Sequence, residues 1–189
     1  MMPIRLAAAD DGAALAEIYR PAVAERATSF EVDPPDAAEM ARRVAATLEH
    51  YPWLVCEDAG QVIGYAYASR HRERAAYQWA VEVSAYVRDG AHRKGVGRQL
   101  YESLFRILAL QGYHRAFAGI TLPNEASVGF HGALGFTPVG TYHRIGWKRG
   151  SWHDVLWLER AVQDQLAPPD GPPTPLVRLG PSTIAAALT

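Results

Sequence analysis

The sequence predicts one domain of mixed α and β structure. Two observations lead to this expectation. Apolar segments of strand length alternate along the chain with amphipathic segments of helical period, and 189 residues suit a single domain. A chain of this size buries enough surface to need neither a disulfide nor a metal for its core. We expect this domain over residues 1–165, followed by a separate tail over residues 166–189.

Two helices are expected near the start of the chain. Asp10 or Asp11 can cap the first, and Asp36 with Glu39 has the spacing of a capping box that opens the second. Later helices are expected from Val96 to a stop at Gly112, and over residues 125–134. Strands are expected at residues 4–7, 53–57, 62–69, 79–87, 115–120, 139–144 and 155–159.

The composition changes near the end of the chain. Six of the 13 prolines lie between Pro168 and Pro181, with little helical or strand periodicity. Such a segment cannot bury much apolar surface. We therefore expect a proline-rich tail that is extended or disordered.

Charge and cysteine content exclude several classes of protein. A net charge of −1 argues against a nucleic-acid partner, which usually requires a basic excess. The single Cys56 cannot form an intrachain disulfide and lies in an apolar run, so we expect it to be buried in the core. The seven histidines show no metal-ligand spacing, so no metal is expected. No apolar run approaches the ~20 residues that span a bilayer, and the first residues do not resemble a signal peptide. We expect a cytoplasmic protein without a membrane partner.

A basic loop containing glycines joins a predicted strand to a predicted helix. Arg93 and Lys94 supply charge, and Gly95 and Gly97 lie where the helix begins. The first amide groups of a helix have no partner within it, and the helix dipole is positive there. Glycines would let an anion come close to the main chain. The loop therefore predicts a phosphate site, the alternative being an ordinary helix start on a solvated basic surface.

Two common phosphate motifs do not fit this loop. A Walker A loop would need a lysine where Val96 stands. A dinucleotide fingerprint would need a third glycine where Leu100 stands. The spacing instead resembles the pyrophosphate loop of the GNAT acetyltransferases. That family has glutamine or arginine where this chain has His92, a change that weakens a side-chain contact and leaves the main chain intact.

A second segment, residues 124–136, resembles the GNAT pattern N-x-x-[AS]-x-x-φ-[YH]-x-x-x-G-F. Asn124, Ser127 and His131 are spaced by three and four, so they share one helical face. In the family this face looks onto the pantetheine arm and the thioester. The two motifs occur in the family's order. The resemblance implies a GNAT fold, with a mixed, mostly antiparallel central sheet flanked by helices and splayed between the fourth and fifth strands.

Further segments are similar to one branch of this family, the phosphinothricin and methionine sulfoximine N-acetyltransferases. The resemblance covers residues 4–160, and its most specific parts are residues 20–23, 27–31, 79–82, 119–124 and 147–155. It implies transfer of an acetyl group from acetyl-CoA to the free amino group of a small amino-acid-like substrate, and it implies a homodimer.

Two residues are candidates for proton transfer. An α-amino group with a reference pKa near 8 is largely protonated at neutral pH, so attack on a thioester needs a base. Glu82 lies within an apolar strand, where a carboxylate is costly to desolvate; the alternative is a half-exposed or ion-paired glutamate. The family places its catalytic glutamate here. His131 stands where many GNAT enzymes carry a tyrosine that protonates the leaving thiolate, and it could act as acid, as base or as a substrate anchor.

Substrate contacts follow from the same resemblance. The residues expected to bind acetyl-CoA are Ala85, Tyr86, Val87, His92, Arg93, Lys94, Gly95, Val96, Gly97, Arg98, Asn124 and Ser127. Arg72 and Arg74 precede the strand of Glu82, and a guanidinium matches a carboxylate or phosphinate well. A solvated charge cluster is the alternative for both. The aromatic residues that could wall the acceptor are Phe30, Tyr77, Trp79 and Tyr142.

Two other functions stay open at the level of sequence. The same chemistry could serve another amine, such as a peptide N-terminus, a polyamine or a different amino acid. A peptide acceptor would need an open groove, whereas a small acid needs a closed pocket containing Arg72 or Arg74. The second alternative is an acyl-CoA-binding module without turnover, which the presence of both Glu82 and His131 disfavours.

Overall fold

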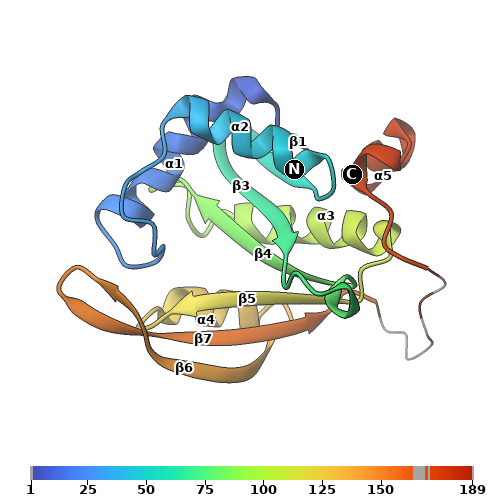
Figure 1. Cartoon of the computed structure of the whole chain (residues 1–189). Coiled ribbons are helices and arrows are strands. Elements are labelled where there is room, and N and C mark those ends of the chain that lie inside the picture. The colour runs from blue at the N-terminus through green and yellow to red at the C-terminus, as the bar shows by residue number, and fades with distance from the viewer. Residues whose placement is uncertain (1, 164–168, 170, 189) are drawn as a thin grey trace.

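A computed structural model describes residues 2–163, 169 and 171–188 of the chain. Its centre is a seven-stranded sheet in the order β1-β2-β3-β4-β5-β7-β6 (Figure 1). All neighbouring strands are antiparallel except β4 and β5. The strands are β1 (Ile4–Leu6), β2 (Trp53–Asp58), β3 (Gln61–Arg70), β4 (Ala80–Val87), β5 (Arg115–Thr121), β6 (Thr137–Lys148) and β7 (Ser151–Ala161). The mixed, mostly antiparallel sheet predicted from the sequence is confirmed.

The one parallel pair is short. β4 and β5 are in register only at Ala80–Arg115, Val81–Ala116 and Glu82–Phe117. Beyond Glu82 the two strands separate, so the rest of β4 is paired on one side only, to β3. The predicted splay between the fourth and fifth strands is confirmed, and it begins at Glu82.

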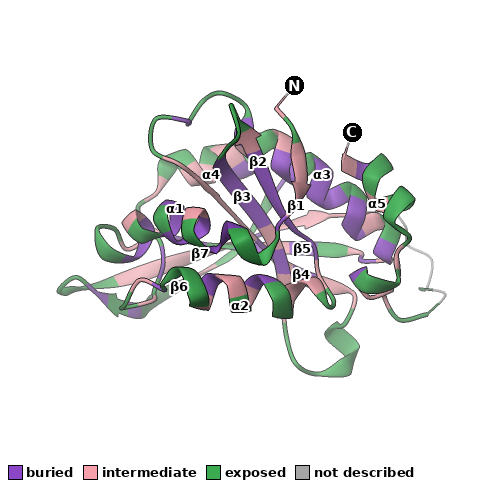
Figure 2. Ribbon diagram, turned by 90° about the horizontal axis from the view of Figure 1, so that it is seen from above, coloured by how far each residue is buried: buried purple, intermediate pink, exposed green. Residues whose placement is uncertain are grey.

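Helices cover both faces of the first half of the sheet. The helices are α1 (Gly12–Ala24), α2 (Ala37–Leu48), α3 (Val96–Gln111), α4 (Glu125–Gly132) and α5 (Pro181–Leu188), with short 3-10 turns η1 (Ala9–Asp11), η2 (Ala75–Tyr77) and η3 (Leu176–Arg178). Along β2, Trp53 and Val55 join the core under α1 and α2, whereas Leu54 and Cys56 join the core under α3. Both faces of β2 are therefore covered, which explains its unbroken apolar run (Figure 2).

Two helix starts differ from the expected caps. Asp36 accepts a hydrogen bond from the Glu39 amide at 2.8 Å, but the Glu39 carboxylate pairs with Arg43, so only half of the capping box forms. Asp11 makes no side-chain cap for α1. Its carboxylate instead accepts from both terminal nitrogens of Arg5, each at 2.8 Å, because this buried charge needs a close partner.

The tail differs from the extended or disordered segment that its composition predicts. Its residues 171–188 form η3 and α5, and α5 packs against α3. Leu176 is buried in the α3 core, Gln111 donates to the Thr174 carbonyl at 2.8 Å, and Arg106 donates to the Ala187 carbonyl at 2.7 Å. The prolines thus surround a short apolar anchor. The predicted boundary at residues 165 and 166 falls outside the described residues.

This anchor makes a measurable contribution to stability. Leu176→Ala removes a fully packed side chain and should lower the free energy of unfolding by about 2–4 kcal/mol. Val177→Ala is the matched control, because Val177 is 69% exposed and should change stability by less than about 0.5 kcal/mol. Urea denaturation of both variants checks this. Equal stabilities for the two would mean that the tail is not docked.

Candidate active site

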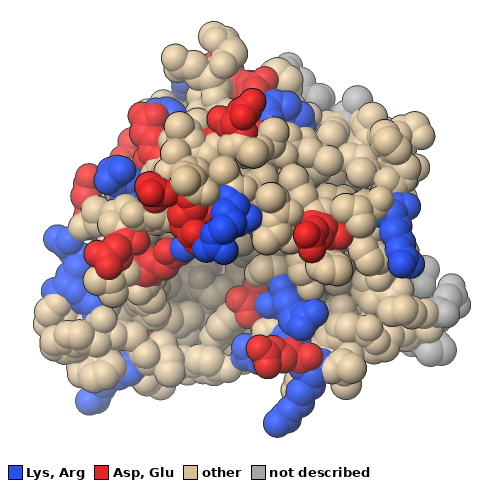
Figure 3. Space-filling view, turned by 45° about the horizontal axis from the view of Figure 1, so that its top comes forward, with Lys and Arg blue, Asp and Glu red and all other residues tan. Residues whose placement is uncertain are grey.

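A cleft of about 770 Å³ opens where β4 and β5 separate. Its walls are the two diverging strands, α1 and the loop that follows it, the loop before α3, and the facing sides of α3 and α4. Figure 3 shows a hollow on the surface with basic and acidic side chains along its rim. Every residue expected to bind acetyl-CoA lines this cleft except Lys94, and His131 lines it as well. The described residues contain no cluster that could hold a metal ion, and none of the described helices is long and apolar enough to cross a membrane.

The unpaired edge of β4 forms one wall. The backbone groups of Val83 to Val87 bond to β3 on one side, while β5 has moved away on the other. A strand edge without a neighbour presents free N–H and C=O groups to the cleft. An extended molecule with amide groups can bond to this edge as an added strand would.

The start of α3 forms the end of the cleft. Gly95 has φ +81° and precedes the helix without any side-chain cap. The first hydrogen bond of the helix runs from Gln99 to the Gly95 carbonyl at 3.0 Å, so the amides of residues 96–98 have no partner within the helix. These amides can bind an anion. Gly97 lines the cleft and also permits α3 to pack closely against α4, since a Cβ there would lie 3.0 Å from the Phe130 ring.

Acidic and basic groups share the loop before α3. Asp89 accepts from Arg26 at 2.9 Å and contacts His92 at 3.3 Å. The hydrogen bonds from Arg26 and then His92 lower the pKa of Asp89, so this carboxylate stays charged at neutral pH. His92 is the residue at which this loop departs from the family pattern. Its side chain contacts the Asp89 carboxylate and also lines the cleft.

α4 supplies the second motif. Asn124 caps this helix by accepting from the Ser127 amide at 3.1 Å. His131 is buried, and its Nδ1 lies 2.8 Å from the Ser127 carbonyl, which can only accept, so Nδ1 carries the proton. Nε2 is then the acceptor for the Tyr101 hydroxyl at 3.2 Å. Burial lowers the pKa of His131, which favours this neutral form.

Glu82 lies at the closed end of the cleft without lining it. Its side chain points to the same face of the sheet as those of Ser84 and Tyr86, opposite to Val81 and Val83. The carboxylate is one-third exposed, and its Oε1 lies 3.1 Å from Nδ1 of His71 and 3.9 Å from Arg72. The structure thus places a carboxylate on one face of β4 and the cleft residues His131 and Tyr101 on the other.

Aromatic rings surround His71, the partner of this carboxylate. His71 stacks on Phe117 with 4.3 Å between centroids, and Trp157 lies edge-on to His71 at 6.0 Å. Tyr142 lies 6.0 Å from Trp157, and the Arg72 guanidinium lies 5.9 Å from the same indole. Three of the residues predicted to contact the acceptor lie at this cluster. Arg72 and Tyr142 lie against Trp157, and Tyr77 lies against His71.

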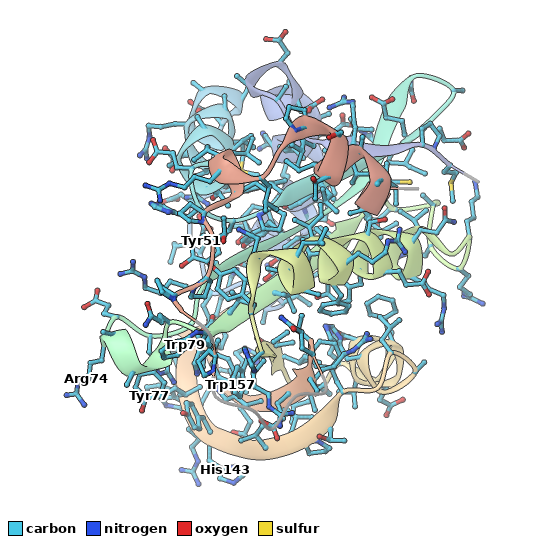
Figure 4. All side chains as sticks on the ribbon, turned by 90° about the vertical axis from the view of Figure 1, so that its right-hand side faces the viewer. Tyr51, Arg74, Tyr77, Trp79, His143 and Trp157 are labelled. Atoms are coloured by element: carbon cyan, nitrogen blue, oxygen red, sulfur yellow. The ribbon has the colours of Figure 1, made fainter. Side chains whose placement is uncertain are left out.

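The other predicted acceptor residues lie elsewhere. Figure 4 shows Arg74 pointing away from the body of the protein. Trp79 donates from Nε1 to the Gly171 carbonyl of the tail at 2.9 Å. Phe30 lies over Gly146, where a Cβ would meet its ring at 2.2 Å, and Lys148 donates to the carbonyls on either side of Phe30, those of Ser29 and Glu31, at 2.6 and 2.8 Å. These last contacts attach the loop between α1 and α2 to the β6–β7 hairpin.

The sequence prediction missed several residues of the site, among them Arg26 and Asp89 at the cleft and His71, Tyr101, Phe117 and Trp157. The positions of Phe117 and Trp157 could be predicted once β4, β5 and β7 are paired, because the register places both side chains on the face of Glu82. The contacts of His71 and Tyr101 could not be predicted, because their partners Glu82 and His131 lie 11 and 30 residues away in the sequence.

A model of the acetyltransferase (GNAT) domain matches residues 4–157. This chain belongs to the GNAT acetyltransferases. It is 37% identical to the phosphinothricin N-acetyltransferase of Streptomyces viridochromogenes, over 93% of this chain and 95% of that protein. It is 35% identical to the L-methionine sulfoximine/L-methionine sulfone acetyltransferase of Salmonella typhimurium, over 88% of this chain and 98% of that protein.

A solved structure agrees with both relatives. The GNAT superfamily phosphinothricin acetyltransferase of Sinorhizobium meliloti, in complex with AcCoA, is 36% identical and superposes with a TM-score of 0.85, covering 91% of this chain and 96% of that one. This protein is an N-acetyltransferase that uses acetyl-CoA. Its cleft suits that substrate, because an open strand edge leads to bare helix amides and the walls between them are largely apolar.

The left-handed turn at Gly95 should matter for acetyl-CoA binding in this acetyltransferase. Gly95→Ala places a Cβ in a conformation that costs about 1–2 kcal/mol, so the loop should relax and the Kd for acetyl-CoA should rise about tenfold. Gly129→Ala is the control, because a Cβ at that helical position meets nothing within 4 Å. Isothermal titration calorimetry measures both, and an unchanged Kd for Gly95→Ala would count against the anion cradle.

Proposed function

We propose that this acetyltransferase acetylates the free amino group of a small amino-acid-like compound of the phosphinothricin, methionine sulfoximine or methionine sulfone type. The observation that carries the proposal is the position of Glu82. Among the described residues it is the one carboxylate placed where β4 and β5 part, with Arg72 close by and with His71 in contact. The names of the two relatives agree with this class of acceptor.

The two substrates bind on opposite faces of β4. Acetyl-CoA occupies the cleft on the α3 and α4 side, with its diphosphate at the amides of residues 96–98 and its pantetheine along Ala85, Tyr86 and Val87. The acceptor enters from the face of Glu82. An entering α-ammonium loses its proton to the Glu82 carboxylate, directly or through water. The free amine then attacks the thioester carbon where the two compartments meet, at the point of strand separation.

The groups that can supply a proton to the leaving thiolate are Tyr101 of α3 and His131 of α4. The neutral His131 has no proton on Nε2, so it cannot donate from that atom while Tyr101 donates to it. The Tyr101 hydroxyl is the O–H group that the pair presents at the cleft. We infer that the Tyr101 O–H turns from Nε2 of His131 to the leaving sulfur and gives it its proton, and that the phenolate then regains a proton from water in the cleft.

The acceptor's acidic group has a counter-charge nearby. Arg72 lies on the loop between β3 and β4, close to Glu82 and over the edge of the Trp157 cluster. A guanidinium can bind a carboxylate or phosphinate through two parallel hydrogen bonds. This guanidinium favours an acidic acceptor over a polyamine, because a polyamine has no acidic group for it to bind.

Acetyl transfer with purified protein tests the proposal. Release of free coenzyme A should occur with phosphinothricin or methionine sulfoximine, and Glu82→Gln should lower kcat by about 10²–10⁴-fold while the Kd for acetyl-CoA stays unchanged. Other amino acids, a polyamine and a peptide with a free N-terminus serve as competing acceptors. No transfer to any amine would refute enzymatic function, and preference for the peptide or polyamine would refute the acceptor class.

We also propose a homodimer built on the β6–β7 hairpin. β6 is an edge strand of the sheet, and large apolar side chains on the hairpin are exposed: Val139, Tyr142, Ile145, Trp147 and Trp152. Exposed apolar patches on an open sheet edge mark association surfaces. Light scattering should give twice the chain mass for the wild type and a lower mass for Trp147→Asp; a wild-type monomer would contradict this. The cytoplasmic location predicted from the sequence stays a prediction, which cell fractionation would test.

A further inference from the structure

His71 is enclosed on several sides and contacts the proposed base. Its side chain is only 11% exposed, although it lies in the loop that follows β3. Phe117 of β5 stacks on one face of the imidazole with an interplanar angle of 10°, while Trp157 of β7 and Tyr77 of η2 meet it edge-on. Three elements thus fix the orientation of a loop residue, and its Nδ1 points at Glu82.

The contact with Glu82 has a definite direction. An ionised carboxylate only accepts hydrogen bonds, so at neutral pH Nδ1 of His71 carries the proton and donates it to Oε1 at 3.1 Å. Arg72 approaches the same oxygen at 3.9 Å. Oε1 therefore holds the protein contacts, and Oε2 is left for a proton from the acceptor.

We propose that His71 is a positioning residue of this acetyltransferase: it holds the Glu82 carboxylate in the orientation that accepts a proton. The inference rests on the proposed role of Glu82. Fixing the direction of a base matters because proton transfer needs hydrogen-bond geometry between the two heavy atoms. A free glutamate side chain on a strand would sample several rotamers instead.

The groups packed against His71 fit this role. The charged or titratable groups against it are Glu82 from β4, Arg72 from its own loop and Tyr77 from η2, while β5 and β7 present the uncharged rings of Phe117 and Trp157. Among the described residues, Glu82 is the carboxylate that contacts the imidazole.

Two substitutions separate the hydrogen bond from the ring packing. His71→Asn keeps an N–H donor near the place of Nδ1 but loses the stack on Phe117. Its kcat should stay within about threefold of the wild type, because the carboxylate keeps its donor. His71→Phe keeps the stack on Phe117 and removes the donor, so its kcat should fall at least about tenfold, as expected when a base loses its orientation.

The experiment measures kcat and the KM for the acceptor at saturating acetyl-CoA, for the wild type and both variants, with the Kd for acetyl-CoA as a folding control. Retention of kcat in His71→Asn together with its loss in His71→Phe supports the proposal. A loss of kcat that is equal in both variants, or a His71→Phe enzyme with wild-type kcat, overturns it and leaves His71 a packing residue. If His71→Phe does not fold, His71→Asn decides by itself, and a loss of its kcat of about tenfold overturns the proposal. A wild type that acetylates no amine would instead refute the proposed function, which keeps the two failures distinct.

Discussion

The separation of β4 from β5 after Glu82 is the constraint on which the rest of the site depends. Parallel neighbours normally satisfy each other's backbone groups along their whole length. Here only three residue pairs do so, and the remaining edge of β4 faces a cleft. Because the strand also pairs fully with β3 on its other side, the opening costs little rigidity. The cleft can therefore present free backbone groups from a strand that remains part of the sheet.

The same separation brings together groups from two faces of the sheet. The anion site at the start of α3 and the Tyr101–His131 pair belong to one face, while Glu82, His71 and Arg72 belong to the other. Side chains on opposite faces of a strand normally cannot contact one another. A gap between strands lets a substrate pass from one face to the other, so donor and acceptor can be bound separately and still react at one point.

Much of this arrangement could be predicted from the sequence. The order and approximate bounds of strands and helices follow from apolar periodicity, and the residues that the two motifs assign to acetyl-CoA line one cleft, with the exception of Lys94. The tail could not be predicted, because Leu176 and the Gln111 and Arg106 contacts join segments more than 60 residues apart. The acceptor side was predicted only in part. Arg72 and Tyr142 lie in the ring cluster, whereas His71 enters through a loop whose course depends on tertiary packing.

The hydrogen bond between Trp79 and Gly171 has a consequence for how this enzyme could diversify. Trp79 stands at the base of the loop that carries His71 and Arg72, and its indole is held by a carbonyl of the C-terminal tail (Figure 4). Changes in the last twenty residues would therefore reach the acceptor side without altering any group that takes part in the chemistry. Substitutions in the proline-rich tail are therefore a route by which evolution can alter the preference of the enzyme for its amine.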